Sequence, residues 1–275
     1  MMLAELLVKT LVIVTLAVAT HVSHSLTFSG VLASILIGGV ALFLGGWDCF
    51  TILLAFLVLG VAFTKYRRGE KEQGALIQEK GGVRSWVNVL ANGGPPAISI
   101  MLEHVFRMEV LPVFFLTAVC SAAADTLATE IGLLSSSKPR LITDLRRRVE
   151  KGFSGGVTLL GTVAGLLGSL VITLVSLTLY LANAPGMLSA VSDFKRLTVA
   201  CSTGGFLGMV IDSLLGATVQ EAYVSKDGER MCEHPEHGEY VLIKGLKGFD
   251  NHVVNFVSSF LAGLLGVAIY ILAAF

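Results

Sequence analysis

Long apolar runs make up most of this sequence, and each is about as long as a bilayer is thick. A helix needs about 20 apolar residues to cross the hydrocarbon core. The mean hydropathy of +0.78 and the 54% of hydrophobic residues agree with an integral membrane protein. The runs lack the alternation typical of membrane β-barrels, so the predicted fold class is all-α. We expect about eight spanning helices, over residues 3–23, 27–46, 47–64, 85–106, 109–134, 153–183, 193–219 and 250–275.

Basic residues gather in two of the predicted loops, residues 65–84 and 138–151. Loops rich in Lys and Arg face the cytoplasm. With eight spans, both loops and the polar stretch 220–249 fall on that side, and both termini fall on the other. The 20 basic and 20 acidic residues cancel over the whole chain, so nothing indicates a nucleic acid as partner.

Residues 92–96 interrupt the fourth predicted helix with the sequence Asn-Gly-Gly-Pro-Pro. Proline removes a backbone donor from a helix. One interpretation is a simple proline kink, and the other is a broken helix whose ends face a ligand. Glycines also recur at near four-residue spacing over residues 155–168 and 204–216, where we interpret most of them as sites of close helix packing.

Asp125 and Glu130 stand near the end of a segment that is otherwise apolar, AVCSAAADTLATEIGLLSS. A carboxylate in a membrane helix is costly and indicates function unless it is paired. The following loop is basic, and Gly152, Gly155 and Gly156 stand where the next helix is expected to begin. Carboxylates hold Mg²⁺, basic side chains neutralise phosphate, and glycine N–H groups at a helix start bind anions. This stretch therefore suits phosphate chemistry.

A second polar cluster is expected on the same side of the membrane. It contains Asp212, in the motif GMVIDSLLGATVQ, and Asn251 and Asn255 at the start of the last helix. One polar chamber could collect these side chains with Asp125. Other interpretations stay open. Glu130 could pair with a base such as Lys138 or Arg140 while Asp125 faces Mg²⁺, or both acids could form structural ion pairs. The asparagines could serve only as hydrogen-bonding contacts between helices.

Five motifs in order, VLANGGPPA, AADTLATEIGLLSSSKPRLIT, GFSGGVTLLG, GMVIDSLLGATVQ and NHVVNFVSS, cover about two thirds of the chain. Together they resemble the family of the phytyl-phosphate kinase of plastids and cyanobacteria, which includes animal transmembrane protein 19. The family is distantly similar to CTP-dependent polyprenol kinases. The resemblance implies phosphoryl transfer from a nucleoside triphosphate, CTP favoured, to phytyl or geranylgeranyl monophosphate. Phe153 and Leu127 depart from the usual family motifs.

The candidate site follows from these residues and the resemblance. We expect Mg²⁺ on Asp125, Glu130 and Asp212, and catalytic roles for Asp125, Glu130 and Lys151. Residues 1–275 should form one membrane domain, with N-terminal helices in 1–64 and catalytic helices in 80–275. The nucleotide and phosphates are expected to bind Asn92, Thr126, Thr129, Lys138, Arg140, Gly152, Ser154, Gly155, Gly156, Asp212, Asn251 and Asn255.

Two other functions stay open. Intramembrane acids and broken helices also suit a transporter of an anion or ion, although its site is expected near the bilayer midplane. A CTP-dependent lipid cytidylyltransferase would share the metal site and release pyrophosphate. The sequence does not decide the prenyl chain, the nucleotide, or whether a homodimer forms. We expect the site to face the cytoplasmic side of a microbial plasma membrane or an organelle membrane.

Overall fold

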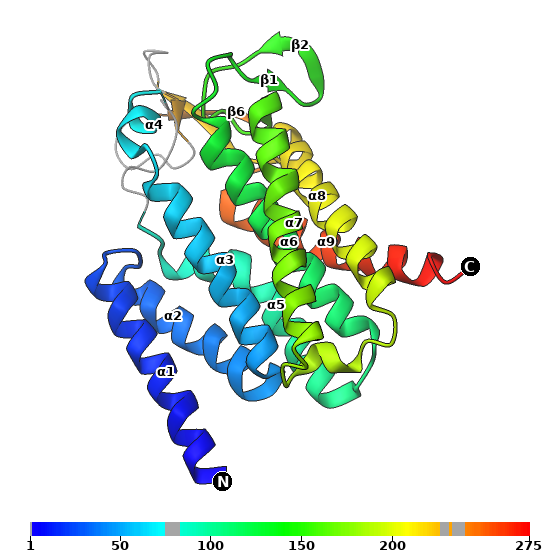
Figure 1. The fold of residues 1–275 in the computed structure, drawn as a ribbon. Coiled ribbons are helices and arrows are strands. Elements are labelled where there is room, and N and C mark those ends of the chain that lie inside the picture. The colour runs from blue at the N-terminus through cyan, green and yellow to red at the C-terminus, as the bar shows by residue number, and fades with distance from the viewer. Residues whose placement is uncertain (1, 75–82, 226–230, 233–239) are drawn as a thin grey trace.

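The computed structural model describes residues 2–74, 83–225, 231–232 and 240–275 (Figure 1). The described chain forms a bundle of helices with small strands at one end. The helices are α1 (Met2–Val22), α2 (Phe28–Gly39), α3 (Trp47–Lys65), α4 (Arg68–Gly74), α5 (Trp86–Phe106), α6 (Val110–Gly132), α7 (Leu159–Leu181), α8 (Phe194–Thr218) and α9 (Asn251–Leu272). A π-helical segment, Val40–Gly45, continues α2, and a 3₁₀ turn, Met187–Ala190, precedes α8.

Two antiparallel sheets of three short strands complete the described fold. The first has the order β2-β1-β3, and the second has the order β5-β4-β6. Both come from loops at the end of the bundle where α6 and α8 terminate (Figure 1). The strands are β1 (Arg140–Leu141), β2 (Asp144–Arg148), β3 (Gly156–Val157), β4 (Ala222–Ser225), β5 (Met231–Cys232) and β6 (Tyr240–Lys244).

The predicted all-α membrane fold is confirmed. Seven helices of the described chain are long and apolar enough to cross a membrane: α1, α2 with its π-helical continuation, α3, α6, α7, α8 and α9. The remaining predicted span is α5, which is less apolar but has 21 residues. At 1.5 Å per residue, that is about 30 Å, enough to cross the hydrocarbon core.

Two predicted features differ from the structure. Helix α5 runs unbroken through Pro95 and Pro96, so the broken helix at residues 92–96 does not occur. The adjacent glycines serve packing instead, since a Cβ at Gly94 would lie 2.8 Å from Phe256 of α9. The helix predicted from residue 153 begins only at Leu159, because the preceding loop makes two turns with positive φ.

Helix α6 is the core of the bundle. It is buried along most of its length and packs against α3, α5, α7, α8 and α9. Small residues on its neighbours allow this close packing. A Cβ at Gly168 of α7 would lie 2.8 Å from the Ala123 carbonyl oxygen, and one at Gly205 of α8 would lie 2.4 Å from the Cβ of Cys120. These glycines therefore have the packing role that their spacing indicated.

At the end of the bundle opposite the sheets, a buried carboxylate joins two parts of the chain. Asp48 lies in the first turn of α3 and is 0% exposed. Its Oδ2 accepts a hydrogen bond from the N–H of Leu188 at 2.7 Å, and its Oδ1 accepts one from the N–H of Cys49 at 2.5 Å. The carboxylate thus fixes the loop between α7 and α8 on the start of α3.

We predict that Asp48→Ala lowers the free energy of unfolding by about 1–3 kcal/mol, because the buried N–H of Leu188 loses its acceptor. Asp48→Asn keeps an acceptor oxygen and should lose less. Thermal unfolding of the purified protein in detergent measures both. An alanine variant as stable as the parent chain would contradict this account.

Candidate functional site

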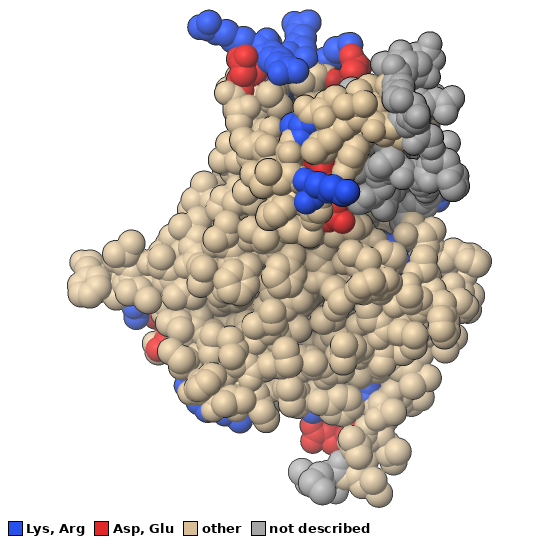
Figure 2. All heavy atoms as spheres, turned by 180° about the vertical axis from the view of Figure 1, so that it is seen from behind, with Lys and Arg blue, Asp and Glu red and all other residues tan. Residues whose placement is uncertain are grey.

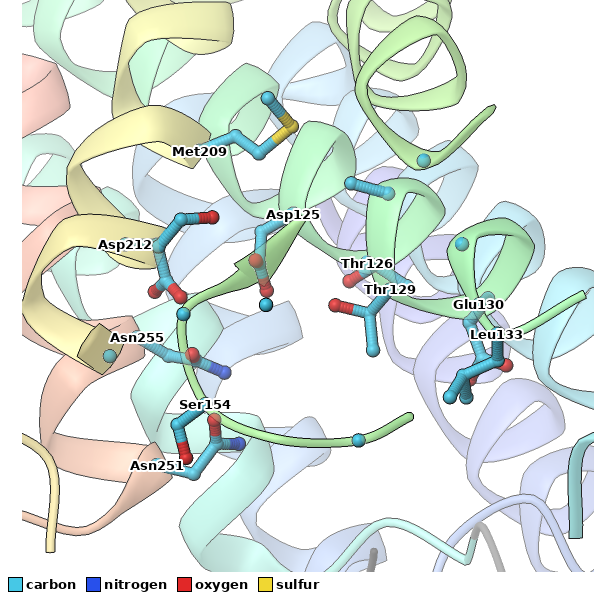
Figure 3. Close-up of a pocket in the computed structure, with 18 of the residues that line it drawn as sticks. Asp125, Thr126, Thr129, Glu130, Leu133, Ser154, Met209, Asp212, Asn251 and Asn255 are labelled. Carbon is cyan, nitrogen blue, oxygen red and sulfur yellow. The ribbon is translucent and has the colours of Figure 1, made fainter. Parts of the chain in front are cut away.

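A polar cavity of about 330 Å³ opens between the ends of α5, α6, α8 and α9 and the loop that precedes α7 (Figure 3). Most of the predicted site residues line it, although they come from five separate segments. Those that do are Asn92, Asp125, Thr126, Thr129, Glu130, Lys151, Gly152, Ser154, Gly155, Gly156, Asp212, Asn251 and Asn255.

Asp125 of α6 and Asp212 of α8 face each other across this cavity, close enough to interact (Figure 3). The packing of the two helices explains why. A Cβ at Gly208 would lie 2.2 Å from Ser121 Oγ, so the helix axes come very close there. Asp125 and Asp212 each follow this contact by four residues, one helical turn, so the same packing brings both carboxyl groups together.

Side chains of α9 hold Asp212 in place. Ser258 Oγ donates to Asp212 Oδ2 at 2.7 Å. With its amide nitrogen turned toward Asp212, Asn255 donates to the same Oδ2 and to the Asn251 carbonyl oxygen, both at 3.1 Å. Asp212 is 8% exposed, so three helices contribute to one largely buried carboxyl site. The predicted second cluster is therefore brought to Asp125, and Asn255 also makes the kind of contact between helices that we considered as an alternative.

The paired carboxyl groups are candidate ligands for the expected magnesium ion. Two ionised carboxylates this close repel each other unless a cation or a shared proton lies between them. Mg²⁺ is usually bound by one or two carboxylates together with water and substrate phosphates. Among the described residues, no group of three or more His, Cys, Asp and Glu side chains is placed to hold a metal. Oxygen ligands beyond Asp125 and Asp212 would therefore come from neutral side chains, water or phosphate.

Glu130 points away from the carboxyl pair (Figure 3). Its Oε2 lies 2.6 Å from Lys71 Nζ of α4, and its Oε1 accepts from Thr64 Oγ1 at 2.6 Å. Lys71 also donates to the Phe63 carbonyl oxygen. Glu130 does form an ion pair, but with Lys71 rather than with the predicted partners Lys138 or Arg140, because α4 brings Lys71 down onto the end of α6.

Lys138 and Arg140 lie outside the cavity lining. Lys138 Nζ lies 2.5 Å from Glu150 Oε1, and Arg140 donates to the Leu145 carbonyl oxygen at 2.6 Å; both side chains are exposed. Figure 2 shows Lys and Arg side chains gathered at the end of the molecule where β2 lies. The fold therefore does not bring these two predicted phosphate-binding residues to the cavity, since Arg140 lies in β1 and Lys138 lies just before it, outside the lining.

Residues 152–156, which we call the glycine loop, line the cavity as a loop rather than as the predicted start of a helix. Gly152 and Gly155 have φ values of +84° and +83°, and a Cβ at Gly155 would lie 2.5 Å from Ala217 of α8. The N–H of Gly156 already donates to the Phe153 carbonyl oxygen at 2.9 Å. The Gly156 N–H is therefore already paired and is not free to bind the phosphate that we expected it to bind.

Two lysine side chains make hydrogen bonds that connect this loop to neighbouring segments of the chain. Lys244 Nζ donates to the carbonyl oxygens of Ser154, at 3.2 Å, and Gly216, at 2.6 Å. Lys151 Nζ donates to the Leu133 carbonyl oxygen at 2.9 Å while it lines the cavity. Lys151 is therefore the predicted basic residue that the fold brings to the cavity.

Arg84 is a cavity residue that sequence reasoning used only for membrane orientation. Its guanidinium packs against Gly60 of α3, where a Cβ would lie 2.4 Å from one of the guanidinium nitrogens. Burial lowers the pKa of Arg84, and the charge of the nearby Glu130 raises it; arginine remains charged at neutral pH in any case. Its position just before an apolar helix that contains asparagines is a sequence signal that could have identified Arg84 as a candidate site residue.

Residues 11–263 match the family described as "Integral membrane protein DUF92", and the chain belongs to this family. It is 32% identical to the "Uncharacterized membrane protein MJ0933" of Methanocaldococcus jannaschii, over 98% of this chain and 95% of that protein. It is 30% identical to "Protein PGR" of Arabidopsis thaliana, over 93% of this chain and 94% of the relative.

A more distant relative is "Protein VTE6, chloroplastic" of the same plant, 22% identical over 88% of this chain and 64% of that protein. No solved structure matches the chain. The predicted family resemblance is confirmed by these matches.

We predict that Lys71 and Glu130 stabilise the fold as a pair. Lys71→Met or Glu130→Gln alone should lower the free energy of unfolding by about 3 kcal/mol, because each leaves one charge without its partner. The double variant should lose less than the sum of the two by about 1 kcal/mol or more. Denaturation of all four proteins in detergent measures this coupling, and strictly additive losses would show that the pair is not an energetic unit.

Proposed function

We propose that this membrane protein is an isoprenyl-phosphate kinase, which transfers a phosphoryl group from a nucleoside triphosphate to phytyl or geranylgeranyl monophosphate. The observation that carries the proposal is the Asp125–Asp212 pair in a polar cavity at the ends of membrane helices. Phosphoryl transfer requires positioning and charge neutralisation rather than covalent catalysis. The resemblance of the five sequence motifs to the phytyl-phosphate kinase family implies the same reaction class.

The reaction balances without a catalytic base. A phosphate monoester has its second pKa near 6, so the lipid monophosphate is mostly dianionic at neutral pH. One of its oxygens attacks the γ-phosphorus of the nucleotide, the bond from the γ-phosphorus to the β–γ bridging oxygen breaks, and a nucleoside diphosphate leaves. The products are the isoprenyl diphosphate and, if CTP is the donor, CDP.

The residues of the cavity take roles that follow from their positions. Asp125 and Asp212 would hold Mg²⁺, which supplies neutralisation of phosphate charge when bound. Ser258 and Asn255 orient Asp212 through its Oδ2. Lys151, held by the Leu133 carbonyl oxygen, supplies positive charge beside the glycine loop. Both carboxylate oxygens of Glu130 already contact Lys71 and Thr64. We therefore assign Glu130 to holding α3, α4 and α6 together at the cavity rather than to binding the metal.

The orientation of the protein is part of the proposal. The exposed basic residues of β2 lie at the same end of the bundle as the polar cavity. By the positive-inside rule, this end faces the cytoplasm, where nucleoside triphosphates are present.

We predict that Asp125→Asn and Asp212→Asn each lower kcat about 100-fold or more, because each removes one of the two carboxylates that would hold the charge-neutralising Mg²⁺. Asp144→Asn, at an exposed position outside the cavity lining, is the matched control and should retain activity. The assay uses purified protein, Mg²⁺, each of the four nucleoside triphosphates and geranylgeranyl monophosphate, with lipid products separated by mass spectrometry. Chelation of Mg²⁺ with EDTA should abolish the product.

The products also distinguish the alternatives. A cytidylyl lipid with release of pyrophosphate would identify a cytidylyltransferase. If no lipid product forms with any donor, while vesicles containing the parent chain move an ion that Asp125→Asn vesicles do not, the kinase proposal is wrong and the acids belong to a transport path.

A further inference from the structure

A second cavity, of about 120 Å³, lies among the N-terminal helices. Its walls come from α1, α2, α3 and the start of α5, and they are almost wholly apolar. Leu16, Ile37, Leu54 and Phe56 are typical of the lining. We refer to it as the apolar cavity, and to the one that holds Asp125 as the polar cavity.

The few hydroxyl groups in the apolar cavity are already satisfied. Ser34 Oγ donates to the Val31 carbonyl oxygen at 2.8 Å, and Thr20 Oγ1 donates to the Leu16 carbonyl oxygen at 2.9 Å. A buried polar group without a partner would favour a polar ligand or water. These hydroxyl groups need no hydrogen bond from a ligand, so the cavity suits a hydrocarbon chain.

The two cavities share part of their walls. Arg84, Asn88 and Asn92 line both. Asn88 and Asn92 are four residues apart on α5, so they share one face of the helix, and Arg84 directly precedes that helix. A ligand with a charged head and an apolar tail could therefore place its head beside these three residues in the polar cavity and its tail in the apolar one.

We propose that the apolar cavity binds part of the tail of the isoprenyl monophosphate and that Arg84 binds its phosphate; this rests on the function proposed above. Arginine presents several N–H donors in a planar fork that matches phosphate oxygens. Gly60 leaves the room in which the guanidinium lies. The N-terminal helices α1 to α3 are thereby the part of the chain that selects the lipid, while the helices from α5 onward supply the phosphate site.

Gly38 of α2 offers a way to fill the apolar cavity. A Cβ at this position would meet only Phe50, at an ordinary contact distance of 3.6 Å, so Gly38→Ala should be accommodated. Gly38→Leu adds a side chain that extends into the lining. Leu36→Phe is the matched control on the same helix, because Leu36 is 62% exposed on the outer surface and does not line the cavity.

The test measures binding to the full chain in lipid nanodiscs, without nucleotide, of geranylgeranyl monophosphate and of the short, soluble dimethylallyl monophosphate. Gly38→Leu should weaken binding of the long ligand about tenfold, or about 1.4 kcal/mol, and leave the short ligand within about twofold. Gly38→Ala and Leu36→Phe should bind both as the parent chain does. Arg84→Gln should weaken both ligands, and Arg84→Lys should restore part of the loss.

The outcomes separate this inference from the proposed kinase activity. If Gly38→Leu binds the long ligand as the parent chain does, or weakens both ligands alike, the tail does not lie in the apolar cavity, whether or not the protein is a kinase. If Arg84→Gln binds both ligands unchanged, Arg84 does not hold the phosphate. If binding follows the expected pattern but no nucleotide gives a diphosphate, the lipid site stands and the kinase proposal is wrong.

Discussion

The close parallel packing of α6 and α8 is the constraint on which the candidate site depends. Two glycines of α8, Gly204 and Gly208, pack against Thr117 and Ser121 of α6 at successive turns. The next step of four residues on each helix gives Asp125 and Asp212. A larger side chain at either glycine would separate the helices and pull the carboxyl groups apart. Small residues in the membrane thus set the geometry of a charged site.

Satisfied polar contacts let this site exist inside an apolar bundle. A carboxylate in a membrane helix is tolerated when neighbouring side chains or a cation compensate for its lost hydration. Ser258 and Asn255 of α9 do this for Asp212. Lys71 does it for Glu130, from a short helix outside the bundle. The site is therefore a property of several helices together and of the loops that cover their ends.

Much of the architecture could be predicted from sequence because the bilayer restricts what a long apolar run can do. The spanning helices and the gathering of Asp125, Asp212 and Asn255 follow from length, charge placement and orientation. The unbroken course of α5 could not be predicted, since prolines are compatible with either outcome and the surrounding packing decides between them. The partner of Glu130 was also missed, because no local pattern indicates that Lys71 folds back onto α6.

The roles of the glycine loop and of Arg84 show a second limit. Glycines beside a basic residue suggested a helix start. The loop instead makes turns with positive φ, and Gly155 packs against Ala217 of α8. Arg84 gave only an orientation signal, because its approach to Glu130 depends on how α3 and α5 pack. Contacts between distant segments, rather than local propensity, determine both.

We infer that Asp125 and Asp212 form one cation site for a phosphate ligand. The most direct test is electron paramagnetic resonance of Mn²⁺, used in place of Mg²⁺, with the purified protein and CTP. We expect one bound Mn²⁺ per chain, lost in both Asp125→Asn and Asp212→Asn and retained in Glu130→Gln. Binding that persists in both aspartate variants, or that disappears only in Glu130→Gln, would contradict it.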